Sequence, residues 1–351
     1  MSAPIHAPTV QFPLITPQHG GVNAVGALVP PLPASTVPIV HHESNGGVTM
    51  VTGARGRRRA LLIAVRYRGD PSELFDGEKD VDVVKNYLLR SGYSAQEMMI
   101  LTELGPPILF PTRNGIIQAI QWLMEGVQSG DRLFFYFAGR GGQVSDAQTK
   151  GDQWKDDTIL PCDFRQTGML DSDTLFQMMA HPLPLGSRLT CIFDSVHCNS
   201  PLDLAYTYAS NGQLIEEKAA KVEMGKMVAT VGISAIKDSP VEAAFHLGKG
   251  LWSMRQTGSQ RKTREAMRQS MGDVVVLSPR FDSSWSYTSL GPLPPGTSMS
   301  RAIVGTLLAQ PAQTFRNIIK NTKDIMMANQ GKRRTQLSSS RPVALDGYFS
   351  C

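Results

Sequence analysis

Residues 188–203 read RLTCIFDSVHCNSPLD and join a strand pattern to a polar turn. Residues 189–193 form a short apolar run rich in strand-forming residues. Asp194-Ser195 follows, and residues 197–199 then continue as a turn of histidine, cysteine and asparagine. A buried strand that ends in a polar turn is typical of α/β folds, whose crevices form beyond the carboxyl ends of the strands.

A second stretch, residues 132–142, has the same form. RLFFYFA at 132–138 predicts a strand, and GRGG at 139–142 predicts a tight turn at its end. Parallel neighbouring strands bring their carboxyl ends to the same edge of a sheet. The two turns are therefore predicted to lie side by side, and this is the place where we expect a catalytic pair.

Apolar runs and amphipathic helical patterns alternate along the rest of the chain. This alternation predicts an α/β fold in which a mostly parallel central sheet carries helices on both faces. The predicted strands are 60–65, 98–101, 132–138, 158–160, 189–193, 273–277 and 334–338. The first predicted helix begins at Lys79 and ends before Gly92, and the second begins after the capping Thr112. Further helices are predicted at 172–179, 214–224, 298–308 and 312–327.

Composition indicates a large folded domain preceded by a disordered arm. Residues 1–56 are rich in Pro, Gly and Ser with few charges, and we expect them to be disordered. No apolar run reaches the length of a membrane span, and no secretory signal pattern opens the chain. We therefore expect a cytosolic or nuclear protein with no membrane partner and with reduced thiols.

The formal net charge of +5 is concentrated in basic clusters at 55–59, 261–264 and 332–334. Clustered Arg and Lys are compatible with nucleic-acid binding. However, no nucleic-acid-binding motif accompanies these clusters. We favour solvated loops that flank strands, and we do not expect a nucleic-acid partner.

The two turns resemble those of the metacaspases, the caspase-like cysteine peptidases of fungi, plants and protists. In that family the first turn reads roughly SGHGG and the second DSCHSG, and the histidine and cysteine form the catalytic dyad. Here Arg140 stands at the histidine position and Val196 at the cysteine position. The resemblance covers residues 59–208, and the Pro-rich arm is like that of simpler, fungal-type members.

The resemblance implies a caspase-like α/β sandwich over residues 57–351. It divides this domain into a part like the caspase large subunit (57–208), a variable loop region (209–270) and a part like the small subunit (271–351). No internal repeat is visible.

The residues at the dyad positions predict that peptidase activity is lost. Valine has no side-chain heteroatom for nucleophilic attack, and an arginine stays protonated and cannot act as a general base. We therefore expect a pseudo-peptidase that acts by binding or regulation. Its partner would be a peptide or a protein, and an active metacaspase is one candidate.

The alternative is an active endopeptidase that cleaves after Arg or Lys with a displaced nucleophile, Cys198. Its neighbour His197 is poorly placed to share a proton with it, because adjacent side chains usually point in different directions. We favour the simpler interpretation that Cys198 replaces a small serine of the family. Cys191, in mid-strand, and Cys162 are expected to be core residues.

The resemblance also implies an acidic pocket for basic side chains. Its matching positions are Asp80 and Asp194, whereas a third position, a serine in the family, is Ala138. Helix-dipole stabilisation of Asp80 and turn-amide binding by Asp194 explain the two aspartates equally well. If the pocket is formed, we expect Arg140 to pair with Asp194 or Asp80 and to fill it.

Calcium is the one cofactor that the resemblance suggests. The matching positions are Asp156, Asp171 and Asp203, and Ser172 stands where the family has a fourth carboxylate. Calcium affinity falls as ligand charges are lost. Asp171 and Asp173 at a helix start are also explained by capping alone. We therefore expect a weakened or absent calcium site.

Overall fold

The computed structural model describes residues 56–71, 73–145, 155–196, 201–217, 270–280, 298–328 and 334–351. The predicted disordered arm, apart from its last residue, lies outside the described residues, as do residues 218–269 of the predicted variable loop. Residues 197–200, which include His197 and Cys198, lie outside them as well. Within the described part, every helix is too short or too polar to cross a membrane.

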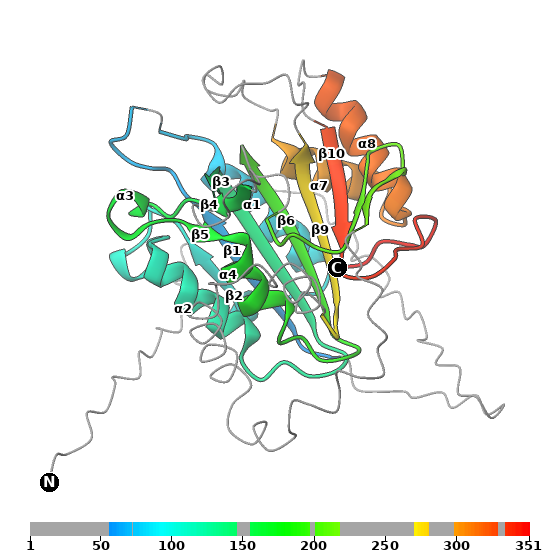
Figure 1. The fold of residues 1–351 in the computed structure, drawn as a ribbon, viewed down its shortest axis with the longest axis horizontal. Helices are drawn as coiled ribbons and strands as arrows, with labels where there is room; N and C mark the ends of the chain where they lie inside the picture. The colour runs from blue at the N-terminus through cyan, green and yellow to red at the C-terminus, as the bar shows by residue number, and fades with distance from the viewer. Residues whose placement is uncertain are drawn as a thin grey trace, which may run out of the picture.

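A single mixed sheet forms the centre of the molecule, and its strands run in the order β2-β1-β3-β6-β9-β10-β7-β8 (Figure 1). The first five strands in this order are parallel, and the last three pair antiparallel. Two further strands, β4 and β5, branch from β3. The bounds are β1 (Arg58–Ala64), β2 (Met98–Leu101), β3 (Arg132–Ser145), β4 (Lys155–Ile159), β5 (Leu170–Asp171), β6 (Arg188–Val196), β7 (Tyr206–Tyr208), β8 (Leu214–Glu217), β9 (Asp273–Arg280) and β10 (Arg334–Ser339).

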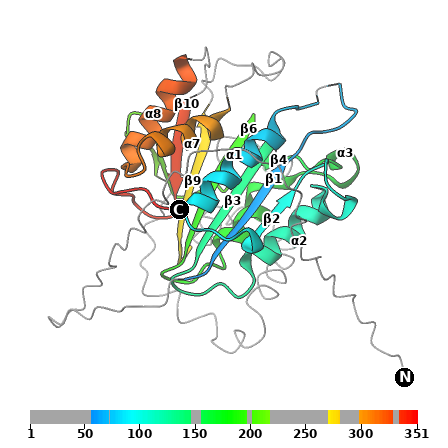
Figure 2. The ribbon, with the colours of Figure 1, turned by 180° about the vertical axis from the view of Figure 1, so that it is seen from behind.

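Helices pack on both faces of this sheet. The cluster of buried side chains on one face includes α1, α7 and α8, and Figure 2 shows α1 in front of the sheet from that side. The cluster on the other face includes α2, α4 and the π turn η3. The bounds are α1 (Gly77–Arg90), α2 (Arg113–Met124), α3 (Phe164–Thr167), α4 (Ser172–Leu175), α7 (Met299–Ala309) and α8 (Phe315–Ala328), with η1 (Ala95–Glu97), η2 (Pro107–Leu109) and η3 (Phe176–Ala180).

The apolar runs of the central strands produce this layered arrangement. Successive side chains of a strand point to opposite faces of the sheet, so a fully apolar strand supplies two cores. In β1, Leu61 and Ile63 join the α2 side, whereas Leu62 joins the α1 side. In β3, Phe135 and Tyr136 divide in the same way. The predicted sandwich with a mostly parallel sheet is confirmed.

The predicted helix boundaries rest on local residues that the structure confirms. The Thr112 hydroxyl accepts a hydrogen bond from the Gly115 amide at 3.0 Å and caps α2. After α1, Gly92 has a φ of +88°, a left-handed conformation that glycine adopts without strain. Asp171 caps α4 in the same way as Thr112 caps α2, accepting from the Thr174 amide at 2.7 Å.

Two local predictions were wrong. The expected GRGG turn at 139–142 is part of β3, which continues to Ser145 and pairs antiparallel with β4. Residues 214–217, predicted as helix, form the edge strand β8, which pairs with the unpredicted β7. In both places, pairing with the neighbouring strand overrides the local pattern, because strand preference depends strongly on the strands that lie alongside.

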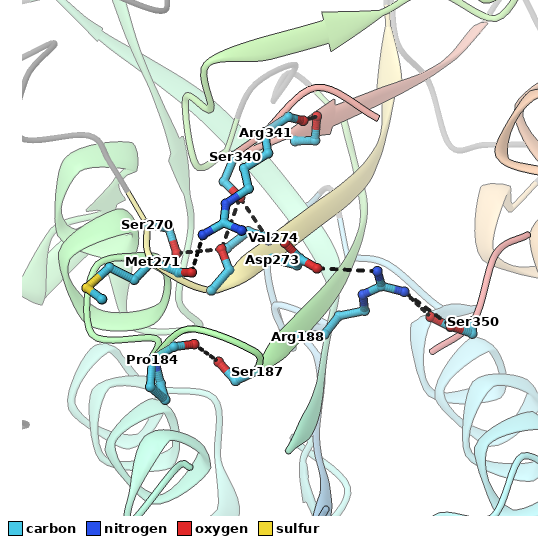
Figure 3. A network of polar contacts seen from close by, with 12 residues as sticks. Pro184, Ser187, Arg188, Ser270, Met271, Asp273, Val274, Ser340, Arg341 and Ser350 are labelled. Atoms are coloured by element: carbon cyan, nitrogen blue, oxygen red, sulfur yellow. Dashed lines mark hydrogen bonds and ion pairs between the residues drawn. The ribbon is translucent and has the colours of Figure 1, made fainter. Parts of the chain in front are cut away.

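Polar contacts join the chain's last residues to the amino ends of the parallel strands (Figure 3). Arg188 at the start of β6 lies 3.4 Å from the Asp273 carboxylate on β9 and donates to the Ser350 hydroxyl at 3.2 Å. Arg341 reaches the other oxygen of Asp273 at 3.6 Å. These contacts tie β6, β9 and the C-terminal segment together at the edge opposite the two candidate turn segments.

Replacing Phe135 by alanine should destabilise the fold strongly. Phe135 is fully buried and its ring lies 5.3 Å from that of Phe193, so the change leaves a cavity between β3 and β6. We expect a loss of about 3–5 kcal/mol in the free energy of unfolding, measured by urea denaturation. Leu104→Ala is the control, because Leu104 is 59% exposed and should change stability little. Equal losses for both variants would contradict this account of the core.

Candidate active site

The described parts of the two segments singled out in the sequence lie side by side at residues 138–140 and 194–196, as predicted. Strands β3 and β6 pair in parallel, and their last register pairs are Ala138 with Asp194, Gly139 with Ser195, and Arg140 with Val196. The positions that the family resemblance assigns to the dyad are thus direct neighbours across two strands. Because β3 continues beyond this point, Arg140 is held on a strand and not in an open turn.

Arg140 is fixed by the loop that follows β1. Its guanidinium lies over the Tyr67 ring, 4.8 Å from the ring centre, and its Nη1 is 3.6 Å from Asp70 Oδ1. The Arg140 side chain is only 17% exposed. Arg165 donates to the other oxygen of Asp70 at 2.6 Å. Asp70 thus lies between two guanidinium groups.

This arrangement corrects the expectation that Arg140 pairs with Asp194 or Asp80. Among the described residues, its ion pair is with Asp70. The reason is geometric. The loop after β1 passes the carboxyl end of β3 and supplies both an aromatic face and a carboxylate, whereas the other two aspartates are engaged by α7, as shown below.

Tyr67 and Glu103 build the loop that holds Arg140. The Tyr67 hydroxyl accepts from the Arg140 amide at 2.8 Å and donates to the Leu160 carbonyl at 2.8 Å. Tyr67 has a φ of +59°, which is uncommon for a residue with a side chain. The buried Glu103 carboxylate stabilises this conformation by accepting the amides of Arg66, Tyr67 and Arg68, the last two at 2.7 and 3.0 Å.

This support was not identified from the sequence. Glu103 is a single acid after a short strand, and its partners are backbone amides 35 to 37 residues away. Only the fold brings them together. Burial raises the pKa of Tyr67 well above its ordinary value, so its hydroxyl stays protonated and serves as both donor and acceptor.

Asp80 and Asp194 are brought together at the amino end of α7. Asp80, in the first turn of α1, is 7% exposed and accepts a hydrogen bond from Arg301 Nε. Asp194 Oδ2 accepts from the Ser298 hydroxyl at 2.8 Å and from the Ser300 amide at 2.9 Å. The two carboxylates and Arg301 thus form one charged cluster, which stands at the positions of the acidic pocket that the resemblance implies, and we keep that name for these three residues. Arg301 was not identified from the sequence, where it is one basic residue in a helix.

The two carboxylates influence each other electrostatically. Burial, and secondly the negative charge of Asp194, raise the pKa of Asp80 from 3.8 to about 6. The charge of Arg301 and its hydrogen bond act in the opposite direction. Asp194 also performs the local role proposed from the sequence, because it binds a backbone amide, here that of Ser300 at the start of α7.

Asp156, Asp171 and Asp203 are the positions that the resemblance assigns to calcium, and the structure describes all three. No group of three potential metal ligands occurs among the residues that the structure describes. Asp171 uses its carboxylate to cap α4, which confirms the capping alternative for this residue. Asp203 has a φ of +45° in the turn before β7, and both it and Asp156 already have polar partners. The weakened or absent site stays a prediction.

The cysteines within the described residues are shielded. Cys191 is fully buried in the core, as predicted, and burial raises its pKa well above the ordinary value. Cys162 packs against the same core, and burial, with help from the Glu103 charge, raises its pKa to about 12. The Cys351 thiol lies 3.5 Å from the Tyr87 hydroxyl, and burial raises its pKa as well. Cys198 lies outside the described residues.

Comparison with known proteins identifies the scaffold. The family model described as "Metacaspase, peptidase C14 domain" matches residues 58–205. Metacaspase-1 of Mycosarcoma maydis is 32% identical over 296 residues, which cover 84% of this chain and 73% of that protein. The chain belongs to the metacaspase family.

Other relatives give the same result. Metacaspase-1 of Pyricularia oryzae is 34% identical and covers 84% of this chain and 74% of its own length. Metacaspase-1 of Candida glabrata is 32% identical, with 91% and 82% covered. A crystal structure of protein GSU0716 from Geobacter sulfurreducens has a TM-score of 0.51 at 16% identity, covering 83% of this chain and 97% of that chain, and shows a similar fold. The metacaspase assignment made from the two turn segments is thus confirmed.

The wild type should lose stability as the pH rises through the raised pKa of Asp80, and the variant Asp80→Asn should not show this loss. The folded-state pKa of about 6 lies above the ordinary value of 3.8, so the stabilising contribution of Asp80 is complete below pH 3.8 and is lost as the pH rises through 6. The charged groups that face Asp80 are Asp194 and Arg301. Relative to Asp80→Asn, the wild type should lose roughly 3 kcal/mol of unfolding free energy between pH 4 and pH 7, since one pKa unit is worth about 1.4 kcal/mol.

Asp346→Asn is the control for this measurement. Asp346 is exposed, and its hydrogen bond from Arg316 lowers its pKa, so its contribution is present at neutral pH and is lost as the pH falls. The difference between the wild type and this variant should therefore run in the opposite direction with pH. A constant difference between the wild type and Asp80→Asn from pH 4 to pH 7 would refute the raised pKa.

Thiol labelling of the native protein should spare Cys162 and Cys191. The thiolate is the reactive form, and burial raises the pKa of both thiols. With iodoacetamide at pH 7.5, followed by peptide mass spectrometry, both cysteines should react at least tenfold more slowly in the native protein than after unfolding in urea. Equal rates in the two states would show that these thiols are not shielded.

Proposed function

We propose that this metacaspase-family protein does not hydrolyse peptide bonds and acts by binding or regulation. The observation that carries the proposal is the register pair Arg140–Val196 at the end of β3 and β6. A cysteine peptidase needs a thiolate and a base within hydrogen-bond reach of it. The matching positions are adjacent in space, but the residues there supply neither group.

Arg140 is unsuited to the base role for two reasons. Its guanidinium stays protonated at any working pH, so it cannot accept a proton. The Tyr67 ring and the Asp70 carboxylate also restrict the rotation of its side chain. Desolvated cation–π and ion-pair contacts of this kind stabilise the charged form, and they turn the position into a structural one.

The described thiols do not compensate for the missing nucleophile. Cys191 and Cys351 are buried, and the high pKa of Cys162 leaves almost no thiolate at neutral pH. The alternative function, an endopeptidase specific for Arg or Lys, thus depends on Cys198. No observation on the described residues favours it.

The remaining scaffold supports a binding role. Its core and its sheet are complete across all eight strands of the main path, so the fold does not need the dyad. We propose a peptide or protein partner in the cytosol or nucleus, with an active metacaspase as the first candidate. This role would be regulatory, because binding without turnover changes the concentration or the activity of the partner.

Purified wild type should release no fluorophore from peptides that end in Arg or Lys, with or without calcium. An active fungal metacaspase serves as the positive control, and its rate should change when this protein is added in excess. Cys198→Ala and the double variant Arg140→His, Val196→Cys are assayed alongside. Wild-type hydrolysis that Cys198→Ala abolishes would show that Cys198 is the nucleophile and would refute the proposal. An unchanged rate of the active metacaspase would exclude that enzyme as a partner.

A further inference from the structure

We infer that Arg301 occupies the acidic pocket of this protein and thereby excludes the basic side chains of peptides or partners from it. This inference goes beyond the proposed function, because it concerns which ligands the pocket admits, whether or not any bond is cut. It makes Arg301 a specificity-determining residue that acts from within the same chain.

The pocket needs a cation. Asp80 and Asp194 come from α1 and β6 and lie close enough for the charge of Asp194 to raise the pKa of Asp80. The Asp80 side chain is only 7% exposed. Two carboxylates in a shielded place repel each other and lose hydration, so a positive charge between the strands and the helix lowers the free energy of the folded state.

Arg301 supplies this cation. Its Nε donates to Asp80 Oδ1, and its side chain is 30% exposed, so Arg301 covers Asp80 and remains in partial contact with solvent. A cation in the first turn of a helix is disfavoured by the helix dipole. The position of Arg301 in the first turn of α7 is therefore explained by the attraction to Asp80 and not by the electrostatics of its own helix.

Asp194 fixes the helix end that carries Arg301. One of its oxygens accepts from the Ser298 hydroxyl, from the Ser300 amide and from the Ser300 hydroxyl, all within 2.9 Å. The Tyr136 hydroxyl donates to Ser300 Oγ at 3.0 Å from the strand beneath. The end of α7 is thus anchored on β3 and β6, and Arg301 is delivered to Asp80 by a rigid support.

An external guanidinium would have to displace Arg301 to reach Asp80. Two cations in the same place repel each other, and the second one would find the best-oriented acceptor already engaged. An intramolecular group also competes at an effective concentration in the millimolar range or above. A single basic side chain of a ligand, which binds one carboxylate pair weakly on its own, therefore does not exchange with Arg301.

Chemical rescue of Arg301→Ala tests this inference. The variant leaves Asp80 without its cation and should have a lower melting temperature than the wild type. N-acetyl-argininamide should raise the melting temperature of the variant in a saturable way and leave that of the wild type unchanged. The uncharged isostere N-acetyl-citrullinamide should have no effect on either protein. Adding Asp80→Asn to the variant should abolish the response.

Arg316→Ala is the matched control variant. Arg316 also pairs with an aspartate, Asp346, but both side chains are exposed, so no shielded cation site should open there. Its melting temperature should not respond to N-acetyl-argininamide. The inference is overturned if the wild type responds at the same concentrations as Arg301→Ala, or if folded Arg301→Ala gives no saturable response.

A measurement on the wild type covers the case in which Arg301→Ala does not fold. In arginine-selective ¹⁵N spectra, the Nε–H signal of Arg301, assigned with Arg301→Lys, should exchange slowly with water. It should keep its position when N-acetyl-argininamide is added, and lose its protection in Asp80→Asn. A fast-exchanging Arg301 Nε–H, or one that shifts saturably with the added ligand, would overturn the inference. None of these readouts requires peptide hydrolysis.

Discussion

The parallel pairing of β3 with β6 is the constraint on which the rest of the molecule depends. It aligns Ala138 with Asp194 and Arg140 with Val196, so that one register sets both the acidic pocket and the positions of the dyad. A shift by one residue would turn Cys191 and Phe193 toward the core on the other face and Ile192 away from its own core, so that neither core would pack as it does here. The two buried clusters fix this register, and the Phe135 and Phe193 rings, which are tilted by 42° with their centres 5.3 Å apart, pack against each other across the two strands. The site is therefore positioned by the core and not by its own polar groups.

Two arginines lie at the carboxyl edge of the sheet, and they pair with different acids. Arg140 lies on Tyr67 and Asp70, whereas Arg301 lies on Asp80. Each guanidinium makes structural contacts at a place where the family resemblance implies a catalytic or ligand-binding group. At residue 140 a permanent cation stands at the position that the family resemblance assigns to the histidine of the dyad. At Asp80 we propose that Arg301 takes the place of an external cation.

The sequence predicted the scaffold well and the interior of the site less well. Strand and helix runs, the Thr112 cap and the Gly92 stop follow from periodicity and local hydrogen bonding, which act over a few residues. The extension of β3 through Gly141 and Gly142 was missed, because it requires β4, whose approach to Gly142 is a tertiary event. The partners of Arg140 and Asp80 were missed for the same reason. Asp70 and Arg301 lie 70 and 221 residues away in the chain, and no local pattern reports a pairing over that distance.

A fold and its chemistry are separable because they depend on different residues. The sheet is held by apolar side chains and by contacts at its opposite edge, such as Arg188 with Asp273, none of which involves the dyad positions. Substitution of a histidine or cysteine position at the carboxyl edge therefore costs the fold little. An arginine at such a position is still a buried charge, and it is tolerated only where a carboxylate and an aromatic face receive it. The loop of Tyr67 and Asp70, held by Glu103 through three backbone amides, provides both. The charge at residue 140 thus depends on a loop that was itself built by the scaffold.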